Sequence, residues 1–173
     1  AECNAGGKAQ QCSRGESSLK QCCSTVTAFS RKKRGSMKGC CFEQYLIDNC
    51  SPTLASLKTA NLFNYRYSST DELNKAVWRW NKELSVKGIS VTVLRRRENT
   101  ALIYVYRTEK LAEDFSRPGV ARFMKRHGYE NTNIGYCIDI LREKLMSSED
   151  FPHEIGIFLG YPLGDVIGFI DNA

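Results

Sequence analysis

The spacing of apolar side chains after Ser69 predicts a helix with one buried face. Ser69 and Glu72 have the spacing of a capping box, in which each side chain bonds to a free backbone N–H at the helix start. Gly88 marks the end of this helix. The apolar stripe consists of Leu73, Ala76, Val77, Trp80 and Leu84. We expect this stripe to pack on the core of the domain.

Two runs after this helix predict a β-hairpin. Apolar and polar residues alternate from Ile89 to Val93, which is typical of a strand with one polar face. After a polar turn, the run ALIYVYR is apolar on both faces, as in a strand that is covered from two sides. We expect antiparallel strands at about 89–94 and 101–107.

Shorter apolar patterns predict helices around this hairpin. Residues 42–50 follow helical spacing, and Ser51-Pro52 suits the start of a second helix, from which Leu54 and Leu57 would face the core. The other segments are a short strand or extended loop at 62–65 and helices around 111–115, 120–127, 134–145, 152–159 and 163–170. The predicted fold is α+β: a single small domain with a short antiparallel sheet, centred on the hairpin and packed against several short helices.

The first 36 residues differ from the rest of the chain. They contain few large apolar side chains, so they cannot bury enough surface to offset the entropy lost on ordering. We expect residues 1–36 to be a disordered, basic, cysteine-containing extension that need not be native. Residues 37–173 would then form the single α+β domain.

The charge distribution argues against a nucleic-acid partner. The net charge is +6, of which +5 belongs to residues 1–36 and +1 to residues 37–173. A nucleic-acid-binding domain would show a basic face in its folded part, so we expect only non-specific contacts from the tail. Within the domain, Arg95–Arg97 is the one local run that suits phosphate, and a solvated strand end is the simpler explanation.

The cysteine spacing and the hydropathy exclude several protein classes. Half of the eight cysteines lie in the extension, and the chain contains no CxxC spacing. No apolar run approaches the roughly 18 residues of a membrane helix, and the first residues lack the apolar core of a signal peptide. We therefore expect reduced thiols, a cytoplasmic location and no membrane partner.

Three stretches resemble a bacterial family, domain of unknown function number 3793. They are NCSPTLASLKTANLFNY, IYVYR and FPHEIGIFLGYPLGDVIGFI, and the resemblance covers about residues 37–172. In that family a histidine often precedes the cysteine that matches Cys50; Asn49 stands there in this chain, which weakens a His–Cys pair. The resemblance implies a further C-terminal segment, so we expect a truncated domain with an open edge or groove that promotes self-association. It implies no established activity, and only a link to redox or iron physiology.

The catalytic candidates are Cys50, His153 and Glu154. A thiol and an imidazole within reach of each other could perform nucleophilic catalysis, and the same residues with His127 could hold a metal. Known signatures such as GxSxG, a P-loop or HExxH are absent, so no metal site or cofactor is identified. The simpler interpretation places His153 and Glu154 at an exposed or cleft-lining helix start, where a carboxylate is favoured.

The leading interpretation is a binding or regulatory module for an unknown small molecule or protein. Lys58, Tyr104, Arg107 and Tyr161 are the candidates for binding an anionic ligand. Trp78 lies off the apolar stripe of its helix, so it suits either a position at the periphery of the core or an exposed anchor for a partner, with the peripheral position the simpler explanation. An enzyme and a metal-binding protein remain the alternatives.

Overall fold

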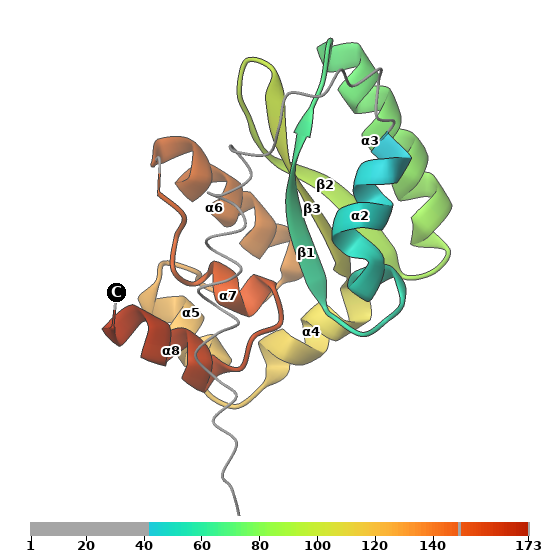
Figure 1. Ribbon diagram of the computed structural model, residues 1–173. Helices are drawn as coiled ribbons and strands as arrows, with labels where there is room; N and C mark the ends of the chain where they lie inside the picture. Colours follow the sequence, from blue (N-terminus) through green and yellow to red (C-terminus); the bar gives the residue numbers. More distant parts are fainter. Residues whose placement is uncertain (1–41, 149, 173) are drawn as a thin grey trace, which may run out of the picture.

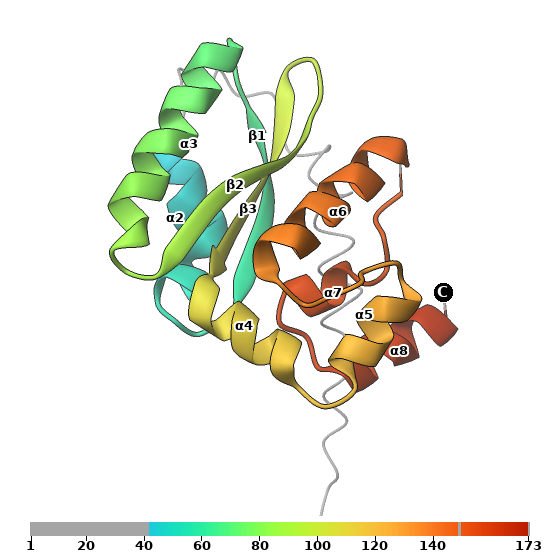
Figure 2. The same ribbon diagram turned by 180° about the vertical axis from the view of Figure 1, so that it is seen from behind.

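The computed structural model describes residues 42–148 and 150–172. In these two ranges, seven helices and three strands form an α+β domain with helices on both faces of one sheet (Figures 1 and 2). The predicted α+β fold is confirmed. The predicted disorder of residues 1–36 lies outside the described residues. None of the helices in the described ranges is long and apolar enough to cross a membrane.

The sheet has three antiparallel strands with β3 in the centre. The strands are β1 (Ala60–Arg66), β2 (Ile89–Arg96) and β3 (Thr100–Arg107), in the order β1–β3–β2. Ile103 of β3 lies between Phe63 of β1 and Val93 of β2. The predicted hairpin is therefore confirmed, and the segment at 62–65 belongs to a third strand.

Two helices cover one face of the sheet. They are α2 (Phe42–Leu54) and α3 (Thr70–Ser85), which lie together on one side in Figure 1. Ile103 and Val105 of β3 point into this side. The buried residues of this cluster are Phe42, Leu46, Cys50, Phe63, Tyr65, Leu73, Leu84, Ile89, Val91, Ala101, Ile103 and Val105.

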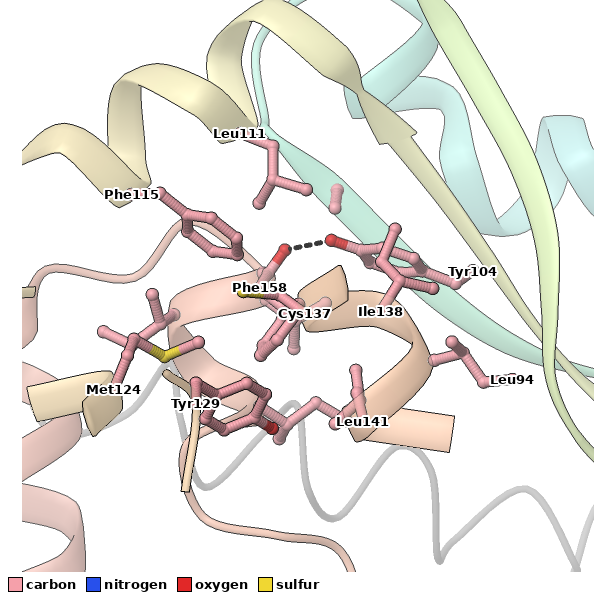
Figure 3. Packing of buried hydrophobic residues seen from close by; sticks show 14 of the residues in the cluster. Leu94, Tyr104, Leu111, Phe115, Met124, Tyr129, Cys137, Ile138, Leu141 and Phe158 are labelled. Atoms are coloured by element: carbon pink, nitrogen blue, oxygen red, sulfur yellow. Dashed lines mark hydrogen bonds between the residues drawn. The ribbon is translucent and has the colours of Figure 1, made fainter. Parts of the chain in front are cut away.

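Five helices cover the opposite face. Leu102 and Tyr104 of β3 point into this side, and Leu141 and Phe158 pack with them (Figure 3). The helices are α4 (Thr108–Ser116), α5 (Val120–Arg126), α6 (Ile134–Ser147), α7 (Ile155–Phe158) and α8 (Leu163–Asp171). The two short closing helices predicted from the sequence are thus present as α7 and α8.

Between residue 42 and β1 the structure has one helix where the sequence predicts two. The buried face of α2 consists of Phe42, Leu46, Cys50 and Thr53. This continuous face keeps the helix intact through Pro52, although a proline cannot donate a helical hydrogen bond. The turn that follows puts Ser56 at a φ of 62° and leaves Leu57 82% exposed. The expectation that Leu57 faces the core is therefore wrong.

The start of α3 has the predicted capping box. The Ser69 hydroxyl accepts a hydrogen bond from the Glu72 N–H at 3.2 Å. The Glu72 carboxylate in turn accepts from the N–H of Ser68 at 3.4 Å, one residue earlier than the usual arrangement. These bonds satisfy backbone groups that would otherwise lack a partner at the helix start.

Side chains from both helical layers bind to the outer edge of β2. The amide oxygen of Asn81 on α3 accepts from the Val91 N–H at 2.9 Å. The guanidinium of Arg142 on α6 donates to the Val93 carbonyl at 3.0 Å. Bonds of this kind hinder pairing with another chain at this edge. Self-association through an open edge or groove stays a prediction.

The position of Val105 provides a test of the central strand. Its side chain is fully buried at the middle of β3, so Val105→Asp would place an unpaired charge in the core. We expect the variant to lose its cooperative thermal transition. Leu57→Asp, at a site 82% exposed, is the matched control and should melt within a few degrees of the parent chain. A soluble, cooperatively folding Val105→Asp chain would contradict the assignment of β3.

Candidate functional site

The structure places Cys50 and His153 on opposite sides of the sheet. Cys50 lies in the cluster between α2, α3 and the sheet. His153 is exposed, and its ring centroid lies 6.0 Å from that of Phe169 on α8, in the opposite layer. The thiol and the imidazole are therefore not brought together as a nucleophile and its base.

Cys50 is poorly suited to nucleophilic chemistry at its position. Its side chain has no exposed surface, and burial raises the pKa of the thiol to about 12, although the Lys58 ammonium acts in the opposite direction. A thiol with such a pKa is neutral near pH 7, and the thiolate is the nucleophile. Cys50 behaves here as a small core residue.

Glu154 is buried in an ion pair, which corrects the expectation that it lies at a solvated helix start. Glu154 is only 3% exposed, and one of its carboxylate oxygens accepts a hydrogen bond from the Lys144 ammonium of α6. The same oxygen accepts from the Tyr129 hydroxyl at 3.2 Å. Burial, and then the charge of Glu154, raise the pKa of Tyr129, which keeps the phenol protonated as a donor. Only His153 of the predicted pair is exposed.

Two of the predicted ligand-binding residues serve the fold. The Tyr104 hydroxyl, fully buried, donates to the carbonyl of Phe158 at 2.6 Å (Figure 3). The Arg107 guanidinium donates to the carbonyls of Thr53 and Leu54, each at 2.7 Å, and so caps the end of α2. The polar groups of Tyr104 and Arg107 therefore point to different parts of the fold and do not form a common ligand site.

The other two predicted ligand-binding residues do meet. The Lys58 ammonium lies 5.2 Å from the ring centroid of Tyr161, within the range of a cation–π contact. Both residues are partly exposed. They lie beside the corner between α7 and α8.

A buried carboxylate holds this corner in place. Asp114 of α4 accepts from the Thr59 hydroxyl at 2.6 Å and pairs with Arg117 at 2.7 Å. Gly160 fits against this pair with a φ of +80°, and a Cβ there would lie 2.5 Å from the Thr59 Oγ1. Three distant segments therefore meet here at van der Waals distance. We call Thr59, Asp114 and Gly160 the corner junction.

A surface cleft of about 310 Å³ lies between the β2–β3 hairpin and the end of α6. We call it the arginine cleft, and it is lined by Arg95, Arg96, Arg97, Leu145, Met146, Ser147 and Ser148. The residues described as lining it include no acidic side chain. The Ser147 hydroxyl donates to the carbonyls of Glu143 and Lys144, whereas the Ser148 hydroxyl accepts from the Asp150 N–H and keeps its own hydrogen to donate. The cleft thus combines positive charge with one hydroxyl donor, which suits an anion.

A β-bulge in β2 creates the cleft. The pairing with β3 shifts between Val93 and Arg95, so that Arg95 lies opposite Leu102. Leu102 faces the α6 side, as does the buried Leu94. Because cross-strand partners share a face, the bulge puts two successive residues, Leu94 and Arg95, on the α6 side. Strict alternation would have turned Arg95 toward α3.

The three arginines have different surroundings. The Arg95 guanidinium donates to the carbonyls of Leu145 and Ser148 at 3.3 and 3.4 Å, at the negative end of α6. It also lies 5.5 Å from the ring centroid of Phe151. Arg96 points to the other layer, where it donates to the Asn74 amide oxygen at 2.8 Å. Arg96 thus contacts a neutral group.

The arginine run is visible in the sequence, but its partner in the cleft is not. Arg95 and Leu145 lie 50 positions apart. No local pattern connects the end of α6 to the hairpin. The bulge, which turns Arg95 toward α6, has no marker in the sequence either, since neither glycine nor proline occurs between Ile89 and Arg96.

No group of three or more His, Cys, Asp or Glu that could hold a metal occurs among the described residues. The Nδ1 of His127 lies 2.9 Å from the Phe123 carbonyl, within its own helix turn. Glu154 is engaged by Lys144 and Tyr129. The suggested site of Cys50, His127, His153 and Glu154 is therefore not assembled.

Residues 46–173 match a family model described as "Protein of unknown function (DUF3793)". No curated protein matches the chain, and no solved structure matches it.

The corner junction predicts a large difference between two glycine variants. Gly160→Ala should cost about 3 kcal/mol, because left-handed backbone strain adds to overpacking against Thr59. Gly128→Ala is the matched control: its φ is +85°, yet no atom lies within 4 Å of the added Cβ, so it should cost about 1 kcal/mol. Urea denaturation measures both. Equal costs would show that the junction does not constrain the corner.

His153 and Glu154 should respond differently to truncation. His153→Ala should change the free energy of unfolding by under about 1 kcal/mol, because the side chain is exposed. Glu154→Ala should cost roughly 2 kcal/mol, since it leaves the Lys144 ammonium and the Tyr129 hydroxyl without their acceptor; Lys144 remains 32% exposed, which limits the loss. Urea denaturation of both variants measures the two changes in the free energy of unfolding. A larger loss for His153→Ala would reverse the two roles.

Proposed function

The chain belongs to the DUF3793 family of proteins of unknown function, and we propose that it is a binding module that holds an anionic ligand in the arginine cleft. One observation carries the proposal: three consecutive arginines and two serines line one cleft of about 310 Å³. Phosphate esters and carboxylates are the anions that a guanidinium binds through two parallel hydrogen bonds.

The surroundings of the arginines support a division of roles. Arg95 is engaged with the carbonyls at the end of α6 and with Phe151, so it fixes the wall of the cleft. Arg96 lines the cleft, but its guanidinium points toward α3 and donates to the neutral Asn74 amide oxygen, so it would meet a ligand at the rim with its charge not offset by that partner. Arg97 adds a further positive charge to the same cleft. Ser148 supplies a hydroxyl donor at the opposite wall, since its hydrogen bond with the Asp150 N–H is one that it accepts.

A binding role needs no reactive pair of side chains in contact, whereas catalysis does. The catalytic alternative depended on Cys50 and His153, which lie on opposite sides of the sheet. The ligand-binding alternative at Lys58 and Tyr161 keeps one cation and one aromatic ring together, but a single ammonium offers an anion fewer hydrogen bonds than a set of guanidinium groups does. We therefore prefer the arginine cleft.

The proposal predicts a specific loss of anion binding. Pyrophosphate should bind the parent chain in isothermal titration calorimetry at low ionic strength. Arg96→Ala combined with Arg97→Ala should weaken it at least about tenfold, because each hydrogen bond to a charged group contributes roughly 1.5–3 kcal/mol. Restoring the charge as Arg96→Lys with Arg97→Lys should recover part of the affinity.

The matched control removes two arginines elsewhere. Arg122→Ala with Arg126→Ala alters two exposed residues of α5 and leaves the cleft intact. It changes the net charge by the same amount, so it should leave pyrophosphate binding within about twofold of the parent chain. Equal weakening by the two double variants, or no binding to the parent chain, would contradict the proposal.

A further inference from the structure

We propose that the exposed face of α3 extends the arginine cleft into a site for single-stranded nucleic acid, with Trp78 as the platform on which a base stacks. The inference rests on the proposed function, because the phosphates of the strand would occupy the arginine cleft. It departs from the expectation drawn from the net charge of +1 over residues 37–173, because the charges that matter here are the local ones of the arginine cleft and of Lys82. It adds a second contact, an aromatic ring, that a simple anion would not use.

Trp78 is a large apolar side chain held in solvent. It is 67% exposed on the outer face of α3, and the residues three and four positions away along a helix are its neighbours on that face. At these positions stand Asn74, Lys75, Asn81 and Lys82, all of them polar. The Lys82 ammonium lies 5.3 Å from the Trp78 ring centroid. The ring therefore stands in a basic, polar surrounding.

Asn74 joins the ring to the cleft. Its amide oxygen accepts from the Arg96 guanidinium at 2.8 Å, and Trp78 follows it by one helical turn. Side chains one turn apart have Cβ atoms about 5–6 Å from each other. The aromatic ring and the nearest guanidinium of the cleft are thus separated by a single side chain.

The neighbours of Trp78 favour a polyanion over a protein partner. Tryptophans that anchor protein interfaces sit in well-packed surroundings, and lysine is depleted at such interfaces. Trp78 instead lies between Lys75 and Lys82. On the same helix, Glu83 follows Arg79 by four positions and Lys75 follows Asp71 by four positions, so an acidic side chain offsets Arg79 and Lys75. Lys82 is then the cation that contacts the ring.

The shape of this face favours a flexible strand. Small molecules bind in concave sites that cover most of their surface, whereas the Trp78 side chain is largely exposed on α3. Base stacking on an exposed ring, together with cations that follow the backbone, is the mode by which proteins bind single strands without sequence preference. A duplex would not offer a free base face to Trp78.

The test uses the full chain, an oligothymidylate, the duplex of the same length and heparin. We expect the oligothymidylate to bind more tightly than the duplex or heparin and to quench tryptophan fluorescence. Trp78→Ala should weaken its binding roughly tenfold or more and remove most of the quenching, while pyrophosphate affinity stays unchanged. Trp78→Phe should restore much of the affinity. Val86→Ala, at an 84% exposed site just past the end of α3, is the control and should have no effect.

Salt dependence separates the two parts of the site. The slope of log affinity against log salt should be lower for Arg96→Ala with Arg97→Ala, because fewer phosphates are neutralised. Trp78→Ala should leave that slope unchanged, because stacking releases few counterions.

Several outcomes would overturn the inference. Pyrophosphate binding without oligothymidylate binding would refute it and leave the proposed function standing, whereas binding of neither would refute both. Equal affinity for heparin, with no effect of Trp78→Ala, would reduce the site to general attraction of polyanions. Tighter, Trp78-dependent binding of a polyglutamate peptide would assign the face to an acidic protein segment and refute the inference as well.

Discussion

The requirement that β3 be covered on both faces determines the architecture of this domain. Its side chains alternate between two apolar clusters, with Ile103 and Val105 on one side and Leu102 and Tyr104 on the other. A strand of this kind cannot lie at the surface, so the sheet needs a helical layer on each face. Cys50 lies in one of these layers and His153 in the other, so the sheet between the layers separates the thiol from the imidazole.

The polar groups inside the helical layers are all tied to the backbone or to one another. The Tyr104 hydroxyl fixes the end of α7 through the Phe158 carbonyl. Asp114 ties α4 to the residue before β1, and Glu154 ties the segment before α7 to α6. Among the described residues, no buried side-chain nitrogen or oxygen lacks a hydrogen-bond partner. Buried polar groups whose hydrogen bonds are all formed fix the positions of the segments relative to one another. They do not by themselves indicate a reactive centre.

The parts of the fold that depend on local patterns could be predicted from the sequence. The capping box, the apolar stripe of α3 and the strand β3, apolar on both faces, are each predicted by residues that lie close together in the sequence. The local sequence around Glu154 predicts a solvated carboxylate at a helix start. Its partner Lys144 lies on the preceding helix, and the positive charge of Lys144 makes the burial of the carboxylate tolerable. Ser51-Pro52 has the local pattern of a helix start, but the buried face of α2 continues through Cys50 and Thr53, and its packing outweighs the single hydrogen bond that Pro52 loses. The cleft depends on a bulge and on a contact across 50 positions, neither of which has a local signature.

The cap that Arg107 places on α2 has a consequence for the order in which the chain folds. The carbonyls of Thr53 and Leu54 belong to the first described helix, yet their donor comes from the end of β3, 54 and 53 positions later. The bonds from Thr59 to Asp114 and from Tyr104 to Phe158 span 55 and 54 positions. Each of these bonds closes a long loop, which costs chain entropy before the contact can stabilise the fold. Such long-range contacts also raise the contact order of a largely helical protein. A chain emerging from the ribosome could form the turns of α2 early, but the helix end would stay unsealed until the central strand had been synthesised and docked.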